Sequence, residues 1–418
     1  MKPFRWLTIF CLLVLILATM SACKNDDDDD DKEDQDDVDD DDDQDDDDDN
    51  DSVDDDNDDD RLLLVGFDGE RIASWLQTAD GWQKMDIPQP ELTTDETDFR
   101  LGPSLVVDGQ TIHSAWNITN EQTYCSTTKR HQWLLFDEAD GWRFVEREPT
   151  AAGHNVRHLG LTTDGVFWAD TYYHYSWWYP NGDGYEHDEQ LYNFTGNAPV
   201  AAYDLQTGSV EAWAMPATGG WAGVLIEYEF APFTFSFLTF ADSQWTETAM
   251  PPDWQNGFIT ALTTDDAQTG YGVFCEVDAK GFSLIRLAAE GWTQIPTPDS
   301  CLAGDLAYVP RRLTGVAEHV IGYSTYWTDN RFLELRDGQW NCRSTIGYET
   351  VIRGAVVLTD GRAFLWLDLD LSSDDPVLVE VLPDSLDTMS LPDDLLRIEQ
   401  LLAVGPDVPP RLLVDGAR

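Results

Sequence analysis

The chain has 418 residues, and its 80 acidic residues against 25 basic ones give it a formal net charge of −55 at pH 7. Nucleic acids bind to basic protein faces, so this charge excludes them as partners. Hydrophobic residues make up 42% of the sequence, which is enough for a large core beside the charged part.

The first 22 residues have the pattern of an export signal. Lys2 and Arg5 give a basic start, an apolar run follows from Leu7 to Ala18, and small residues precede Cys23. This order is typical of a cleavable signal peptide. The apolar run is shorter than the roughly 20 residues that a membrane-spanning helix needs. Residues 1–22 are therefore predicted to be a signal peptide.

The end of this signal resembles the lipobox of bacterial lipoproteins, with Met20-Ser21-Ala22 before Cys23. The resemblance implies a diacylglycerol on the Cys23 thiol and a further acyl chain such as palmitate, and two chains suffice for stable anchoring in the bilayer. Lys24, in place of an aspartate, favours the outer membrane over retention at the inner one. Ordinary cleavage with release of the chain is the alternative.

An acidic segment follows the anchor, completing a predicted region of residues 23–60. Of the 35 residues from Asp26 to Asp60, 27 are Asp or Glu and only Lys32 is basic. Such a segment cannot bury enough apolar surface to offset its ordering entropy, so a disordered, extended tether is expected. Its carboxylates favour weak, diffuse binding of divalent cations rather than a specific site.

Short strands separated by tight turns recur through residues 61–418. Asp-Gly pairs between apolar runs predict hairpins, as at Asp80-Gly81 and Asp360-Gly361. A Trp-bearing strand follows many of these turns, and large aromatic residues of this kind are expected to pack between sheets. Seven such strands are predicted, at Trp82, Trp142, Trp213, Trp245, Trp292, Trp340 and Met389.

The spacing of these strands predicts the fold. Trp245, Trp292, Trp340 and Met389 follow one another at nearly constant intervals close to 48 residues, and a period of this size with several strands per unit indicates propeller blades. The region resembles bacterial β-propeller repeats. We predict an all-β propeller over residues 61–418 with about seven four-stranded blades, six remaining open. Strands near residues 398–404 and 411–414 would pair with the first strands and close the ring.

Four cysteines lie in the predicted propeller, and an even number in an exported domain permits two disulfides. The candidates are Cys125, Cys275, Cys301 and Cys342. Three pairings are possible, and short separation favours Cys275 with Cys301.

The sequence has no recognisable catalytic motif. It lacks a phosphate-binding loop with Gly-Lys-Ser/Thr, a His-Glu-x-x-His helix and a Gly-x-Ser-x-Gly elbow. Its seven histidines are scattered and there is no Cys-x-x-Cys pair. We therefore predict no catalytic residue, no metal site and no cofactor.

One insertion, at about residues 170–199, is rich in aromatic and acidic residues and is the predicted ligand site. Loops on a rigid scaffold carry function, and aromatic faces beside carboxylates suit a sugar, a cation or a peptide. A self-packed loop is the alternative. A similar aromatic pair occurs further along the chain. The candidate residues are Tyr172, Tyr173, Trp177, Trp178, Tyr179, Tyr326 and Trp327.

Two functions follow from these features. The first is a membrane-anchored, non-catalytic binding or scaffold module with a glycan or protein ligand. The second is a propeller hydrolase or lyase that acts on glycans. An enzyme of the second kind should gather carboxyl groups with shifted pKa values at one mouth of the propeller, which a binding module does not need.

Overall fold

The computed structural model describes the chain from Asp60 to Leu413, within one compact unit, Asp56–Arg418. Within that range it leaves out residues 108–109, 123–124, 148–154, 162–166, 178–183, 196–197, 205–207, 215–219, 227–233, 242–243, 249, 251–253, 255–256, 265–268, 277–281, 289–290, 303–308, 317–318, 326–329, 346–349, 369–375 and 406–410. For some strand residues, including 120–122, 125–129, 167–177 and 184–190, it describes the backbone alone. No described helix is long and apolar enough to cross a membrane.

The described part is all-β, with sheets of antiparallel strands, as predicted. Taken in the order in which their strands pair, the first sheet contains β29 (Arg397–Val404), β1 (Arg61–Phe67), β2 (Ile72–Thr78) and β3 (Gly81–Asp86). The second contains β30 (Arg411–Leu413), β5 (Ser104–Val107), β6 (Thr111–Gln122), β7 (Cys125–Asp137) and β8 (Gly141–Val145), with β4 (Asp98–Leu101) also paired to β6.

The next sheets each contain four strands that follow one another in the chain. The third has β9 (Asn155–Leu161), β10 (Phe167–Trp177), β11 (Gly184–Thr195) and β12 (Ala198–Asp204). The fourth has β13 (Gly208–Ala214), β14 (Gly220–Ile226), β15 (Thr234–Ala241) and β16 (Gln244–Thr248). The fifth has β17 (Gly257–Thr264), β18 (Gly270–Glu276), β19 (Phe282–Ala288) and β20 (Gly291–Ile295).

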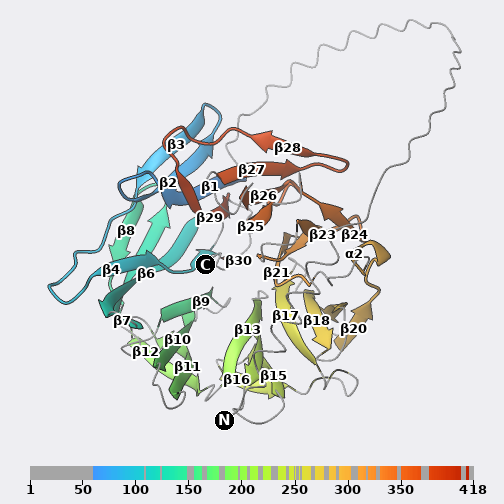
Figure 1. Cartoon of the computed structure of the whole chain (residues 1–418), viewed down its shortest axis with the longest axis horizontal. Helices are drawn as coiled ribbons and strands as arrows, with labels where there is room; N and C mark the ends of the chain where they lie inside the picture. Colours follow the sequence, from blue (N-terminus) through green and yellow to red (C-terminus); the bar gives the residue numbers. More distant parts are fainter. Residues whose placement is uncertain are drawn as a thin grey trace, which may run out of the picture. The chain divides into compact units, whose positions relative to one another are not determined.

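The last two sheets repeat this arrangement, and a single helical turn precedes them. The turn is α2 (Asp299–Leu302). The sixth sheet has β21 (Arg312–Val316), β22 (His319–Tyr323), β23 (Arg331–Arg336) and β24 (Gln339–Ser344). The seventh has β25 (Val351–Val357), β26 (Ala363–Asp368), β27 (Pro376–Val381) and β28 (Leu386–Met389). Figure 1 shows first strands such as β13, β17 and β21 near the centre and last strands such as β20, β24 and β28 outside, which is the arrangement of a β-propeller.

The glycines of the Gly-Trp turns are required by backbone conformation. Gly81, Gly141 and Gly291 have φ values of 116°, 70° and 112°, in the region that residues with a side chain rarely adopt. A Cβ built on any of them would meet no atom within 4 Å, so conformation rather than space selects glycine. Each of these turns joins the last two strands of its sheet, as the sequence pattern predicted.

The tryptophans after these turns pack against the preceding sheet, which confirms their predicted role. Trp142 in β8 donates a hydrogen bond of 2.9 Å from Nε1 to Ser74 Oγ in β2. The ring of Trp292 in β20 lies 4.7 Å, centroid to centroid, from Phe237 in β15. These contacts explain why large aromatic residues recur on strands that are otherwise exposed to solvent.

The inner strands are apolar without alternation because sheets cover both of their faces. Leu62, Leu63, Leu64 and Val65 in β1 are all 0% exposed. They belong to a core cluster that combines residues of the first, second and seventh sheets. Burial on both faces gives continuous apolar runs, in contrast to the period of two of half-exposed strands.

Strands from the two ends of the described chain share sheets. β29 pairs with β1 from Arg61↔Val404 to Phe67↔Arg397, as expected, whereas β30 pairs with β5 of the second sheet and not with the strands of the first. Buried side chains join the same sheets, because Ser104 Oγ donates to Gln400 Oε1 at 2.5 Å and Gln400 Nε2 donates to the Gly102 carbonyl at 2.7 Å.

Two predictions about this region were wrong. Trp213 was taken to end a unit, but it lies in β13, the first strand of the fourth sheet, and β12 ends the third sheet instead. The disulfide joins Cys301 and Cys342, not Cys275 and Cys301. Cys301 lies in α2, which contacts β24, where Cys342 is found. Cys275 is a buried free thiol, and burial raises its pKa to about 11.

Candidate functional site

The predicted aromatic insertion forms a hairpin of the third sheet. Tyr172, Tyr173 and Trp177 lie in β10, and β11 returns beside it. Trp178 and Tyr179, at the turn of this hairpin, lie outside the described residues, as do Tyr326 and Trp327 between β22 and β23. Cys125 is the first residue of β7, and the structure describes its backbone but not its side chain.

The hairpin extends beyond the body of its sheet. β9 pairs with β10 only as far as Tyr172, and β12 pairs with β11 only from Gln190 onward. Residues 172–177 and 184–189 therefore pair with each other, and of these only Tyr172 also pairs with a neighbouring strand, at Asn155 of β9. We call this two-stranded part, residues 172–177 and 184–189, the ribbon. Beyond these points the edges of the hairpin are not paired with β9 or β12.

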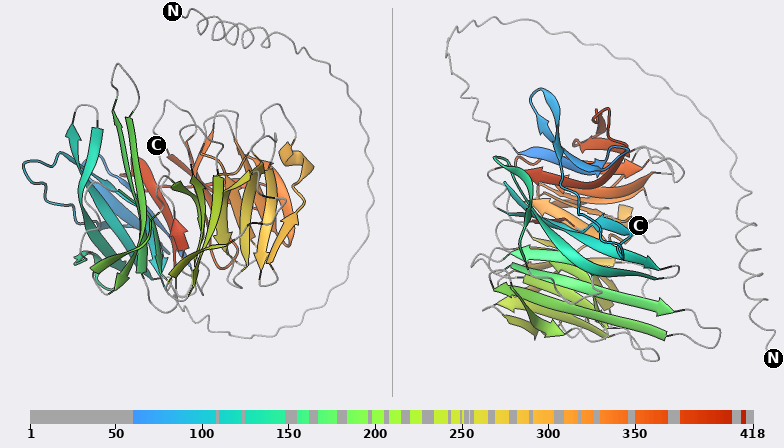
Figure 2. Two further views of the ribbon diagram at one scale, coloured as in Figure 1. Left: turned by 90° about the horizontal axis from the view of Figure 1, so that it is seen from below. Right: turned by 90° about the vertical axis from the view of Figure 1, so that its left-hand side faces the viewer.

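The ribbon lies at the end of the propeller where the second and third strands of the sheets are connected. β6–β7 and β10–β11 each connect such strands, counted outward from β5 and from β9. Strands that alternate in direction bring equivalent connections to the same end. Figure 2 shows the teal β6–β7 hairpin and the green β10–β11 hairpin projecting in the same direction.

The register of the ribbon separates its residues into two faces. Tyr173 pairs with Asp188, Tyr175 with Glu186, and Trp177 with Gly184. Alternate positions of a strand share a face of the sheet, so one face combines these three aromatic positions with two acidic ones. We call it the aromatic face. The opposite face takes the remaining positions, which are Tyr172, His174, Ser176, Tyr185, His187 and Glu189.

The described charged residues do not form a group suited to acid catalysis. Among them, each carboxyl pKa that departs from its ordinary value is lowered, at Asp68, Glu96, Asp137, Glu334 and Asp394. Such groups stay ionised and are poor proton donors at neutral pH. They also lie in separate places: the first sheet and its connections, the second sheet and the sixth.

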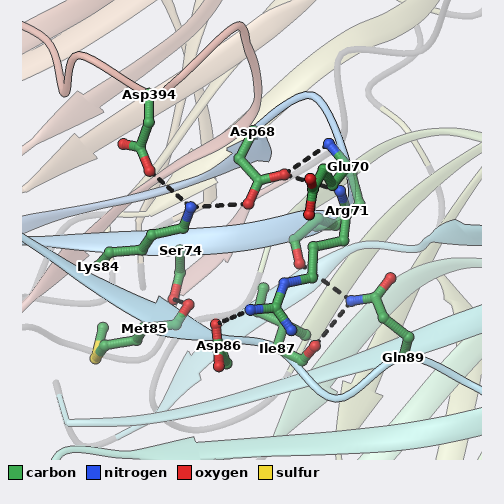
Figure 3. A network of polar contacts seen from close by, with 11 residues as sticks. Asp68, Glu70, Arg71, Ser74, Lys84, Met85, Asp86, Ile87, Gln89 and Asp394 are labelled. Carbon is green, nitrogen blue, oxygen red and sulfur yellow. Dashed lines mark hydrogen bonds and ion pairs between the residues drawn. The ribbon is translucent and has the colours of Figure 1, made fainter.

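The lysine network of the first sheet shows how these carboxylates are held (Figure 3). Lys84 Nζ donates to Asp68 Oδ2 at 2.8 Å and to Asp394 Oδ2 at 2.6 Å. Trp75 Nε1 donates to Asp394 Oδ1 at 2.9 Å, and Lys84 Nζ lies 5.4 Å from the centre of the Trp75 ring. The hydrogen bonds with the carboxylates raise the pKa of Lys84, so this lysine is not a nucleophile. The network instead connects β3 with the segment before β29.

A second network is buried in the sixth sheet and was not found from the sequence. Glu334, 3% exposed, accepts hydrogen bonds from Arg343 at 2.8 Å and lies 3.0 Å from His319 Nε2. His319 Nδ1 lies 2.8 Å from the Gly361 carbonyl, and Arg336 and Arg343 both donate to carbonyls near β27. Burial raises the pKa of Glu334, but the hydrogen bonds from His319 and Arg343 outweigh it and lower the pKa overall. The cluster links the sixth and seventh sheets.

Metal ligands are likewise not gathered among the side chains that the structure describes, since no group of three or more His, Cys, Asp or Glu there could hold an ion. The ribbon is the candidate site that the sequence predicted. Its residues were found from their aromatic composition, whereas their division into two faces depends on the register, which the sequence did not specify.

Comparisons with known proteins give no family for this chain. No family model matches the sequence, and no curated protein matches it. Solved structures are similar in fold: the β-propeller domain of the Trilobed protease from Pyrococcus furiosus is 9% identical, with a TM-score of 0.48, over 79% of this chain and 95% of that one. An ulvan lyase is 10% identical, with a TM-score of 0.45, over 80% of this chain and 92% of that one.

Proposed function

We propose that this chain is a membrane-anchored lipoprotein whose β-propeller is a non-catalytic binding module, with a glycan site on the aromatic face of the ribbon. The observation that carries the proposal is the ribbon itself, which leaves the sheet and presents three aromatic positions opposite two acidic ones. Aromatic rings stack on sugar rings through apolar contact, and carboxylates accept hydrogen bonds from hydroxyl groups.

The scaffold in this proposal is a closed ring of seven blades. First strands of successive sheets contact one another in the order β29, β5, β9, then β13, β17, β21, β25 and again β29, except between β9 and β13, where β11 contacts β13. This order supports a ring in which the seventh sheet meets the first. The pairing of β29 with β1 and of β30 with β5 would close it with strands from both ends.

The anchor and the tether set where this module would act. A lipidated Cys23 would hold the chain in a bilayer, with the outer membrane favoured by Lys24. At about 3.3 Å per extended residue, the 35 residues from Asp26 to Asp60 would let the propeller reach on the order of 100 Å from the membrane. The last residue of the predicted tether, Asp60, is held against the propeller. Its side chain is 5% exposed, and Asp60 Oδ2 accepts a hydrogen bond of 2.5 Å from the Thr359 amide.

The net negative charge of the propeller limits the class of glycan that it would bind. Residues 61–418 contain 53 acidic and 21 basic residues, so the propeller repels polyanions, and the two acidic positions of the aromatic face add to that repulsion. A neutral or amino-sugar polymer fits this field.

The test is a glycan-array screen of the whole mature chain beside two variants. Trp177→Ala removes one aromatic position of the aromatic face, and Tyr185→Ala, the matched control, removes one of the opposite face. We expect saturable binding to neutral glycans that falls about tenfold, or about 1.4 kcal/mol, in Trp177→Ala and persists in Tyr185→Ala.

Other results would overturn this assignment. Equal loss in both variants, or no glycan bound by a folded natural chain, would reject the aromatic face as a sugar site and leave a protein ligand. Shortened products after incubation with a bound glycan would establish the hydrolase or lyase instead of the binding module.

A further inference from the structure

The opposite face of the ribbon combines two histidines with a carboxylate. His174 pairs directly with His187, and Glu189 follows His187 by two residues on the same strand. Because alternate positions share a face, these three residues occupy one face, which is not the aromatic face. This juxtaposition depends on the register of β10 and β11 and is not visible in the sequence, where the two histidines are 13 positions apart.

The spacing of these positions suits a single metal ion. Residues directly opposite in an antiparallel pair have Cβ atoms about 4.5–5.5 Å apart, and a position two residues along lies about 7 Å further on. Imidazole nitrogens bind Zn²⁺ at about 2.0–2.1 Å and carboxylate oxygens at about 2.0–2.2 Å. The backbone spacing of these three positions is therefore that of residues able to share one ion.

We propose that His174, His187 and Glu189 form a binding site for a divalent transition-metal ion. Two imidazoles and one carboxylate favour Zn²⁺ or Cu²⁺, whereas Ca²⁺ and Mg²⁺ require oxygen ligands. Three protein ligands leave a coordination position open for water or a group of a bound molecule. The three positions lie at or beyond Tyr172 on β10 and before Gln190 on β11, where the pairing with β9 and β12 ends. The proposal goes beyond glycan binding and does not depend on it.

The tether is the competing location for a cation and differs in chemistry. Residues 26–60 contain no histidine or cysteine, and their charged groups are carboxylates apart from Lys32. They offer oxygen ligands that an excess of Ca²⁺ occupies. Nitrogen ligation therefore distinguishes the ribbon from the tether, even in the full chain.

The experiment is Cu²⁺ titration of the untagged mature chain in excess Ca²⁺, followed by electron paramagnetic resonance. We expect one bound Cu²⁺ with hyperfine coupling to nitrogen. His174→Ala, His187→Ala and Glu189→Gln should each weaken binding at least about tenfold, because even residues that only orient a metal ligand are worth that much. Gln190→Ala changes the neighbour of Glu189 on the other face and should leave binding unchanged. Circular dichroism checks that every variant is folded.

A competition titration with Zn²⁺ completes the test. Because sites with nitrogen and oxygen ligands bind Cu²⁺ more tightly than Zn²⁺, a large excess of Zn²⁺ should be needed to displace the nitrogen-ligated Cu²⁺, and the competition should fit a single site. The proposal is wrong if the natural chain shows no nitrogen-ligated Cu²⁺. It is equally wrong if the signal survives in the His174→Ala/His187→Ala double variant, which would assign the metal to one of the other histidines.

Discussion

The disulfide between Cys301 and Cys342 is expected to contribute strongly to the stability of the propeller. The change to make is the double substitution Cys301→Ala/Cys342→Ala, which removes the cross-link between α2 and β24. The cysteines are 41 residues apart in the sequence, and their Cα atoms are 5.3 Å apart. A bridge closing a loop of this length lowers the entropy of the unfolded chain enough to stabilise the fold by about 4 kcal/mol, and measured bridges typically give about 2–4 kcal/mol.

Urea unfolding of the natural chain and the variant, followed by tryptophan fluorescence, measures this loss. The midpoint should fall, and the slope of the transition should rise slightly, because the unfolded chain without the bridge is less compact and exposes more surface. Cys275→Ala is the matched control: it removes the free thiol of the same apolar cluster and leaves the bridge intact.

Reductant provides the decisive comparison for this pairing. The natural chain and Cys275→Ala should both lose stability on addition of reductant, whereas the double variant should not respond. The reasoning fails if the double variant unfolds at the same urea concentration as the natural chain. It also fails if Cys275→Ala loses its response to reductant, which would mean that Cys275 forms the bridge.

Three further predictions concern the core and the buried charges. Leu64→Ala removes a side chain that is 0% exposed and should cost about 3 kcal/mol in the free energy of unfolding. Glu334→Ala leaves Arg343 without its buried carboxylate partner and should cost about 2–4 kcal/mol in the same urea assay, with Glu380→Ala as a control. Arg130 lowers the pKa of Glu96 to about 2, so the stabilisation from this pair is complete above about pH 5 and is lost as the pH falls toward 2. The thermal unfolding temperature of the Glu96→Gln variant should therefore depend less on pH across this interval than that of the natural chain. An equal dependence in the two proteins would contradict the pairing.

The sequence was most informative where local chemistry determines structure. The Asp-Gly and Gly-Trp pairs marked turns that require positive φ, as at Gly81 and Gly361. The turn predicted at Asp360-Gly361 is followed by β26, Ala363–Asp368, as a hairpin requires. Such turns depend only on residues within a few positions, so their signal survives without any knowledge of the rest of the fold.

Features that depend on distant neighbours were missed or misassigned. Trp213 resembles the tryptophans in the last strands of the repeat units, yet it lies in β13, the first strand of its sheet. The 32 positions from Trp213 to Trp245 hold only the three strands that follow β13, so Trp213 cannot end a separate unit. The pairing of Cys301 with Cys342 depends on the contact of α2 with β24, so short sequence separation was a poor guide. Among so many acidic residues, nothing marked Glu334 as the one that folding would bury.

The candidate site was predictable in composition but not in geometry. Aromatic residues around Trp177 indicated a ligand-binding insertion, and the backbone confirms that the segment is a long hairpin. Which residues share a face depends on register, and a slip by one residue would exchange the two faces. Histidines 174 and 187 therefore looked like scattered residues until the pairing placed them opposite each other.

The most direct test of the account is a crystal structure of the mature chain soaked with the tightest-binding neutral glycan from the array. The account predicts an intact oligosaccharide on the aromatic face, with sugar rings stacked on Tyr175 or Trp177 and hydroxyl groups near Glu186 or Asp188. Density for the glycan at another part of the propeller, or a cleaved product in place of the intact chain, would contradict it.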